Sequence, residues 1–178
     1  MNKIIFLDHD GVLCMRREQG SRFLKMKQWN LENPDQAVIY TNKVNHVPIH
    51  IRFDDLNKDA VRVLNEILIE SDADIIISSD WRLKCTLEEM QEFYTKMGIV
   101  KVPIGMTELY STDGFTRIGN TLGEQRCIEI EKYIEQNKPD KWVVIDDMDL
   151  SELQNFVKCK PSEGLKKLGM KKKIIKFL

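Results

Sequence analysis

Two carboxylates, Asp8 and Asp10, follow an apolar run at residues 4–7. Such a run is typical of a β-strand that is covered on both faces, and residues two apart in an extended chain point to the same side. Neighbouring anions repel each other, so this spacing indicates a site for a divalent cation, and oxygen ligands favour Mg2+ or Ca2+. His9 points to the opposite side and is interpreted as a neighbour of the site. As an alternative, Asp10-Gly11 has the composition of a β-hairpin turn.

Two other apolar runs also stop abruptly in polar residues. They are residues 75–77, followed by Ser78, Ser79 and Asp80, and residues 142–145, followed by Asp146 and Asp147. Helical patterns separate the three runs, which predicts a parallel sheet with right-handed crossovers. Open α/β sheets bind ligands at the carboxyl ends of their strands. The three polar clusters are therefore expected at one edge of the sheet, although serine and aspartate are also common helix caps.

The elements that must position these residues follow the same order. Apolar residues recur at three- and four-residue intervals over residues 54–70, 86–98 and 123–136, which predicts three helices, the second of which begins with a capping box. A last short strand is expected at residues 156–158. Residues 103–122, which are rich in glycine, are interpreted as a loop. The predicted fold class is α/β, a three-layer Rossmann-like parallel sheet with helices on both faces.

Residues 14–53 separate the first strand from its helix and are far longer than an ordinary connection in an α/β fold. They are interpreted as an insertion in a single domain that spans residues 1–178. Apolar residues alternate with others over residues 47–53, and residues 41–43 can turn the chain back from residues 38–40, so a β-hairpin flap is predicted. Two roles are open for this flap: to cover the site and select substrates, or to be a surface decoration.

The composition indicates one globular domain, with 178 residues of which 42% are hydrophobic. The chain has 27 basic and 28 acidic residues, so its net charge of -1 does not indicate nucleic-acid or membrane binding, although it permits a local basic groove. Four scattered cysteines favour neither zinc nor disulfides and fit reduced thiols. A soluble cytoplasmic protein is expected, with no membrane partner and no evident obligate protein partner. The lysines near the C-terminus are interpreted as a solvated face: Lys166, Lys167, Lys171, Lys172, Lys173 and Lys176.

In their order along the chain, these motifs resemble those of the haloacid dehalogenase (HAD) superfamily of phosphohydrolases. The first motif is a strand followed by Asp-x-Asp-Gly, here residues 8–11. The second is a strand that ends in serine or threonine, here Ser78. The fourth is a strand that ends in acids, here Asp146 and Asp147. The likeness covers most of the chain and implies the HAD fold.

The third HAD motif is a basic residue, most often lysine, on the helix before the fourth motif. Arg126 is the best candidate here, and Lys132 and Lys138 are the alternatives. The helix of Arg126, the Ser-Ser-Asp-Trp-Arg run at residues 78–82 and the tail at residues 161–165 are also similar to a HAD branch associated with RNA-repair proteins.

The resemblance implies a phosphomonoesterase that works through an aspartyl-phosphate intermediate. Asp8 is expected to attack phosphorus as the nucleophile. Asp10 is expected to protonate the leaving oxygen and later to accept a proton from the attacking water. Ser78, Ser79 and Arg126 are expected to bind the oxygens of the substrate phosphate.

The resemblance also implies Mg2+ as the cofactor. The expected ligands are the Asp8 carboxylate, the Asp10 carbonyl and Asp146, and Asp147 is expected to bind the ion directly or to support one of its ligands. The favoured substrate is a nucleotide or a nucleic-acid phosphate end, and a small phosphorylated metabolite is the alternative. A non-catalytic HAD-like binding module and a receiver-type phosphoacceptor are competing functions. Asp10 argues against both, because neither needs an acid–base group.

Trp81 and Arg82 follow the second polar cluster and allow two interpretations. They either pack the start of the following helix, which is the favoured reading, or they stack on and clamp a substrate base.

Overall fold

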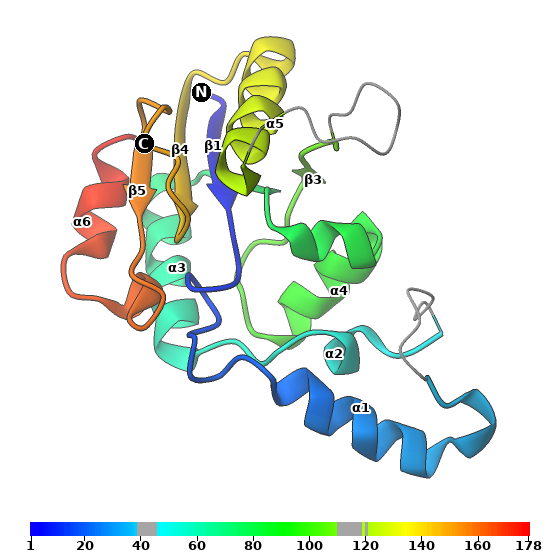
Figure 1. Ribbon diagram of the computed structural model, residues 1–178. Coiled ribbons are helices and arrows are strands. Elements are labelled where there is room, and N and C mark those ends of the chain that lie inside the picture. The colour runs from blue at the N-terminus through cyan, green and yellow to red at the C-terminus, as the bar shows by residue number, and fades with distance from the viewer. Residues whose placement is uncertain (39–45, 110–118, 120) are drawn as a thin grey trace.

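Five parallel strands form one sheet in the order β3-β2-β1-β4-β5, with β1 at its centre (Figure 1). The structure is a computed structural model and describes residues 1–38, 46–109, 119 and 121–178. The strands are β1 (Lys3–Leu7), β2 (Asp74–Ile77), β3 (Gly105–Met106), β4 (Lys141–Asp146) and β5 (Phe156–Lys158). Every neighbouring pair is parallel, so the predicted sheet is confirmed.

The strand register sets the level at which the polar clusters begin. Leu7 lies opposite Ile77 of β2 and Ile145 of β4. The ladder continues by one step beyond these residues, because the Asp8 N–H donates to the Ile145 carbonyl at 3.1 Å and the Ser78 N–H donates to the Leu7 carbonyl at 3.2 Å. The segments that follow β1, β2 and β4 therefore begin at the same edge of the sheet and at the same level.

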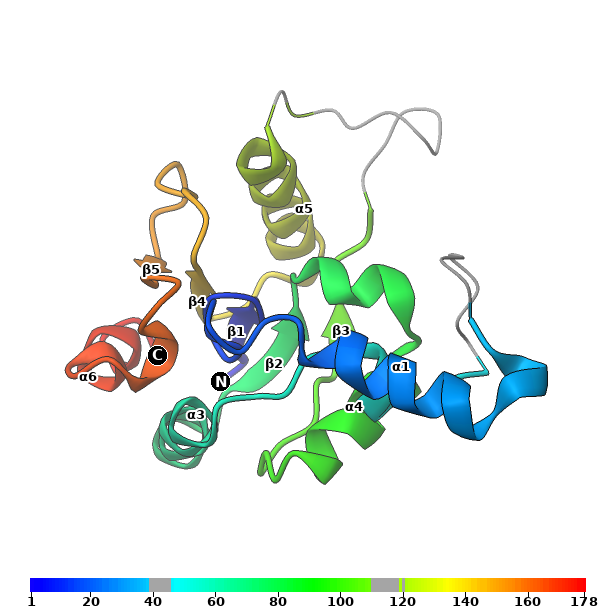
Figure 2. The same ribbon diagram turned by 60° about the horizontal axis from the view of Figure 1, so that its bottom comes forward.

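Helices cover both faces of the sheet, as predicted. They are α3 (Lys58–Ser71), α4 (Leu87–Lys96), α5 (Leu122–Asn137) and α6 (Met170–Ile175). Alternate residues of β1 enter two cores: Ile5 and Leu7 pack with residues of α3, α4 and α6, whereas Ile4 and Phe6 pack with Cys127 and Ile130 of α5. Figure 2 shows α5 on one side of the sheet and α3 and α4 on the other. The predicted capping box at the start of α4 is present.

The described part of the insertion at residues 14–53 forms helices joined by turns and irregular segments, so the predicted hairpin flap is wrong there. It contains α1 (Ser21–Glu32), the 3₁₀ helix η1 (Pro34–Gln36) and α2 (Ile49–Arg52). The apolar pattern predicted a strand because Ile49 and Phe53 are four residues apart, but this spacing also places two side chains on one face of a helix. Both side chains are buried. The other half of the proposed hairpin, at residues 39–45, lies outside the described residues.

Three further observations concern the loop at residues 103–122, the cysteines and the length of the helices. Residues 103–122, predicted as a loop, contain the two-residue strand β3, which pairs with Ile76 and Ile77; residues 110–118 and 120 lie outside the described part. The four cysteines are free thiols, in agreement with the sequence. Among the described residues, no helix has the length and apolar character needed to cross a membrane.

Candidate active site

Three carboxylates converge where β1 and β4 end. Asp8 follows β1, Asp146 is the last residue of β4, and Asp147 comes next in the chain. Each of them offers an oxygen atom, and these atoms all lie within 4.8 Å of one another. Asp8 and Asp146 are buried, with 4% and 0% of their surface exposed. The parallel register predicted from the sequence is what brings them together.

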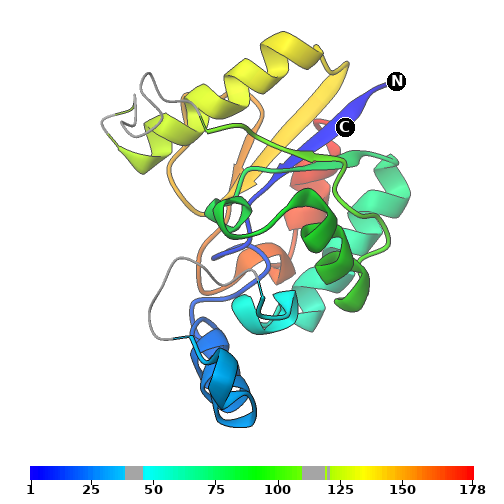
Figure 3. The same ribbon diagram turned by 90° about the vertical axis from the view of Figure 1, so that its right-hand side faces the viewer.

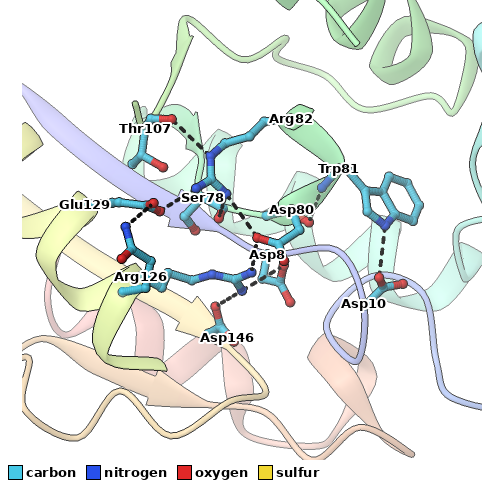
Figure 4. Close-up of polar contacts among 12 residues, drawn as sticks. Asp8, Asp10, Ser78, Asp80, Trp81, Arg82, Thr107, Arg126, Glu129 and Asp146 are labelled. Atoms are coloured by element: carbon cyan, nitrogen blue, oxygen red, sulfur yellow. Dashed lines mark hydrogen bonds and ion pairs between the residues drawn. The ribbon is translucent and has the colours of Figure 1, made fainter. Parts of the chain in front are cut away.

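Arg126 on α5 is the cation that faces these acids (Figure 4). Its Nη1 lies 2.6 Å from Asp146 Oδ2 and 3.1 Å from Asp8 Oδ1, and its Nη2 donates to Asp80 Oδ1 at 3.2 Å. Of the three basic residues considered for the third motif, the structure places Arg126 against Asp8. Lys132 lines a separate pocket beside Tyr133, and Lys138 is exposed just beyond the end of α5.

Among the residues that the structure describes, Arg126 is the cation paired with this cluster, and one guanidinium does not balance three carboxylates. Burial, followed by the charge of Asp146, raises the pKa of Asp8 to about 8, although Arg126 and a hydrogen bond from Ser79 oppose this. Burial and Asp146 also raise the pKa of Asp147 above its ordinary value. Burial disfavours the charge of Arg126, yet Asp8 and Asp146 outweigh burial and raise its pKa. Oxygen donors with excess negative charge are the environment that a hard divalent cation such as Mg2+ fits.

Asp10 lies in the turn that follows β1, with its side chain outside the three-carboxylate cluster. Its Oδ2 accepts a hydrogen bond of 3.0 Å from the indole N–H of Trp81, and its buried Oδ1 has no partner among the described residues. Burial raises the pKa of Asp10. A contribution of Asp10 to a metal at the cluster would therefore come from its carbonyl, as the resemblance implies.

Gly11 explains why the chain can turn at this point. Its φ of +71° is a conformation that side chains with a Cβ rarely adopt, and a Cβ there would lie 2.2 Å from Asp147 Oδ2. The hairpin alternative for Asp10-Gly11 is wrong, because β1 pairs with two parallel strands and the turn folds back on itself through bonds to the His9 carbonyl. The glycine thus brings the loop backbone directly against Asp147.

The two serines after β2 are placed differently. The buried hydroxyl of Ser78 has no hydrogen-bond partner among the described residues, so it is available to a ligand. The hydroxyl of Ser79 accepts a hydrogen bond from the backbone N–H of Trp81 at 3.4 Å and interacts with Asp8. Both serines are buried beside Asp8, as the sequence analysis expected of phosphate-binding residues, and that role stays a prediction.

A buried ion pair between Arg82 and Glu129 was missed by the sequence analysis. Arg82 also donates to the carbonyls of Ser78, at 2.6 Å, and Thr107, at 3.0 Å, and so links the ends of β2 and β3 to α5. The signal was available: Glu129 lies three residues after Arg126, so both charges occupy the face of α5 that packs on the sheet. Arg82 therefore packs against α5 and the ends of β2 and β3, whereas the favoured interpretation expected it to pack the start of the following helix.

Trp81 is held between two rings and is 2% exposed. Its indole stacks on His9 and on Phe53, with ring centroids 4.5 Å apart in each case. Both faces of the indole are covered, so stacking on a substrate base does not fit this arrangement. His9 is fully buried, its Nε2 lies 3.0 Å from the Tyr94 hydroxyl, and burial lowers its pKa to about 3. His9 is thus a neutral packing neighbour of the site.

Comparison with known proteins identifies a family for most of the chain. Residues 4–168 match the family described as "HAD domain in Swiss Army Knife RNA repair proteins". The matched segment contains the three strand-end clusters, Arg126 and the whole insertion. No match was found among the curated proteins or among the solved structures.

Proposed function

The chain belongs to the HAD-domain family of Swiss Army Knife RNA-repair proteins, and from this premise we propose that it is a magnesium-dependent phosphomonoesterase that forms an aspartyl phosphate on Asp8. Family membership supports a phosphohydrolase of the HAD type. The observation that carries the finer proposal is the convergence of Asp8, Asp146 and Asp147, a cluster that is paired, within the described part of the chain, with the guanidinium of Arg126. A structural role alone would give no reason to bury that excess of negative charge.

The donor set defines where Mg2+ would be held. The carboxylates of Asp8, Asp146 and Asp147 and the carbonyl of Asp10 are hard oxygen donors. When bound, the ion supplies charge neutralisation and polarises a phosphoryl oxygen.

Asp8 is the nucleophile in this proposal. One of its oxygens bonds to phosphorus while the ester P–O bond breaks, which divides a difficult displacement into two easier steps. The Arg126 guanidinium and the unpartnered Ser78 hydroxyl donate to the phosphoryl oxygens, over which the transition-state charge is spread. Water then attacks phosphorus, the Asp8–phosphorus bond breaks, and inorganic phosphate leaves.

Asp10 acts as the general acid of the first step and as the general base of the second. Its raised pKa favours the protonated form that donates to the leaving oxygen, and the resulting carboxylate accepts a proton from the water of the second step. Trp81 holds one carboxylate oxygen of Asp10, and the other has no partner among the described residues. This leaves one oxygen of a fixed carboxyl group available for the proton transfer.

We favour a phosphorylated nucleic-acid end, or a nucleotide, as the substrate. The name of the family, which refers to RNA repair, supports this choice. The alternatives are a small phosphorylated metabolite and a binding module without turnover.

Phosphate release tests the proposal. The substrates are p-nitrophenyl phosphate and oligonucleotides phosphorylated at the 3′ or the 5′ end, each with Mg2+ or with EDTA. The proteins are the parent, Asp8→Asn and the matched control Asp149→Asn, which removes an exposed carboxylate three residues beyond Asp146. We expect turnover that needs Mg2+, is lost in Asp8→Asn and persists in Asp149→Asn. Turnover by Asp8→Asn at the parent rate would rule out the aspartyl-phosphate route, and no turnover by the parent would favour the binding module.

A further inference from the structure

The outer face of α1 combines apolar exposure with positive charge. Phe23, Leu24 and Leu31 keep 62%, 74% and 69% of their surface exposed. Figures 1 and 3 show that α1 projects beyond the carboxyl ends of β1 and β4, on the side where the carboxylate cluster lies. An exposed apolar face on a helix that projects from the rest of the domain marks an interaction surface.

The charge around this face differs from that of the whole chain. Residues 14–33 contain five basic and two acidic residues, whereas the complete chain has a net charge of -1. Two of the five cations, Arg22 and Lys25, pair with Asp54 and Asp55. Arg16, Arg17 and Lys27 are exposed, and none of them forms an ion pair with any residue in the described ranges. Local positive charge of this kind attracts a polyanion. The net charge of the whole chain does not reveal it.

The helix is held in place firmly enough to present a fixed surface. The buried carboxylate of Asp54 accepts hydrogen bonds from the Gly20 N–H at 2.9 Å and the Arg22 N–H at 2.8 Å, at the start of α1. Arg22 also pairs with Asp54 at 3.1 Å, and its guanidinium lies over the Phe23 ring, 5.0 Å from the centroid. The exposed aromatic ring is thus oriented by a cation that is itself anchored.

Arg16 and Arg17 lie on the loop that connects the site to α1, and Lys27 lies on α1 itself. Arg16 is six residues beyond Asp10, and its N–H donates to the Pro161 carbonyl at 3.0 Å. Lys160, next to Pro161, is also exposed. A chain of phosphates that leaves the site therefore meets cations before it reaches Phe23.

We propose that Arg16, Arg17, Lys27 and the Phe23 ring form a docking surface for single-stranded nucleic acid whose phosphorylated end enters the carboxylate site. The cations contact backbone phosphates, and Phe23 stacks on a base, the two elements that sequence-tolerant binding of single strands uses. The proposal rests on the proposed function for the end that is processed. The binding itself is testable without turnover.

Binding is measured by fluorescence anisotropy in the Asp8→Asn background, so that the probe is not consumed. The probes are fluorescein-labelled single-stranded RNA and DNA of about eight nucleotides, a length within the range that one small domain covers. Removal of both cations in Arg16→Gln/Arg17→Gln is expected to lower the slope of log affinity against log salt concentration by about 1.4, because each lost contact to a single strand contributes about 0.7. Phe23→Ala is expected to weaken binding about fivefold or more.

Matched controls separate this surface from general charge and apolarity. Lys172→Gln/Lys173→Gln removes two exposed cations from α6, and Ile69→Ala removes an exposed aliphatic side chain from α3. We expect parent-like affinity and salt slope from both controls. Thermal unfolding of every variant shows whether a loss of binding reflects a loss of fold.

Three results would overturn the proposal. They are parent affinity in both Arg16→Gln/Arg17→Gln and Phe23→Ala, an equal loss in the α6 control, and capture of the protein by vesicles that contain phosphatidylserine without binding to either oligonucleotide. The relative affinities of the RNA and DNA probes show which sugar the surface prefers. If the parent releases no phosphate but Arg16→Gln/Arg17→Gln and Phe23→Ala still lose binding, the proposed function fails and the docking surface stands.

Discussion

The carboxylate cluster at the ends of β1 and β4 and the anchor of α1 at Asp54 both bury negative charge, but they differ in how that charge is compensated. Asp54 accepts hydrogen bonds from two backbone N–H groups and the Ser21 hydroxyl, and it also pairs with Arg22. Asp8 shares one guanidinium with Asp146, and Asp147 lies within the same cluster. A buried carboxylate that accepts enough hydrogen bonds stabilises the fold. A cluster of buried carboxylates with too few donors instead indicates a ligand site.

Substitution of Asp8 and of Asp54 is expected to give the largest effects and to distinguish a ligand site from a structural anchor. Asp8→Asn is expected to lower phosphate release by about 10⁴-fold or more, because it removes the nucleophile. In EDTA the same change should raise the free energy of unfolding by about 1 kcal/mol, because it relieves repulsion at a functional site. Asp54→Asn should do the opposite: turnover of p-nitrophenyl phosphate persists, and stability falls by about 2 kcal/mol. Urea unfolding and phosphate release measure both. A destabilised Asp8→Asn protein would remove the distinction.

The buried pair between Arg82 and Glu129 is a second test of compensated charge. Arg82→Met removes the cation that pairs with Glu129 in the core, although Gln125 still donates to Glu129, and it is expected to lower the free energy of unfolding by about 3–5 kcal/mol. The control is Arg62→Met, which breaks an exposed pair with Glu66 and should cost less than about 0.5 kcal/mol. Equal costs for the two variants in urea unfolding would show that the buried pair contributes no more than a surface pair.

Two glycines with similar backbone angles test the geometry of the cluster. Gly11 and Gly98 have φ of +71° and +74°, but an added Cβ meets Asp147 at Gly11 and nothing within 4 Å at Gly98. Gly98→Ala should cost about 1 kcal/mol from backbone strain alone. Gly11→Ala should cost about 2 kcal/mol and also weaken the response to Mg2+, because Asp147 must move. Equal effects on turnover from the two variants would contradict the close approach of the loop to Asp147.

The smallest expected effect concerns Trp81, which positions Asp10. Trp81→Phe keeps a ring between His9 and Phe53 but removes the N–H donor to Asp10. We expect kcat to fall about tenfold, less than the loss of a general acid itself would cause, with little change in thermal stability. The control is Trp142→Phe, which changes a half-buried tryptophan at the opposite end of the sheet. A kcat for Trp81→Phe equal to that of the control would show that the indole N–H does not position Asp10.

The sequence was sufficient for the features that repeat or lie next to each other in the chain. Apolar runs with abrupt polar ends predicted β1, β2 and β4, and the parallel order then placed Asp8, Ser78 and Asp146 at one edge. Arg126 was the best of three candidates, and Lys132 and Lys138 stayed open because the choice depends on how far α5 is rotated against the sheet.

The parts that were missed depend on contacts between distant residues. Asp54 anchors a helix that begins 33 residues before it, and the Arg82–Glu129 pair joins residues 47 apart. The short β3 is defined by its neighbour β2 rather than by its own sequence. In the insertion, the spacing of Ile49 and Phe53 fits a strand and a helix equally, and tertiary packing decided for the helix.

Thermal unfolding during a magnesium titration is the most direct test of the proposed metal site, because it needs neither a substrate nor turnover. We expect Mg2+ to stabilise the parent and Asp149→Asn, by about 2.7 kcal/mol at a concentration one hundred times the dissociation constant. We expect Asp146→Asn to lose this stabilisation, because one of the three clustered carboxylates is gone. Equal stabilisation of Asp146→Asn and the parent would contradict a metal site at the ends of β1 and β4.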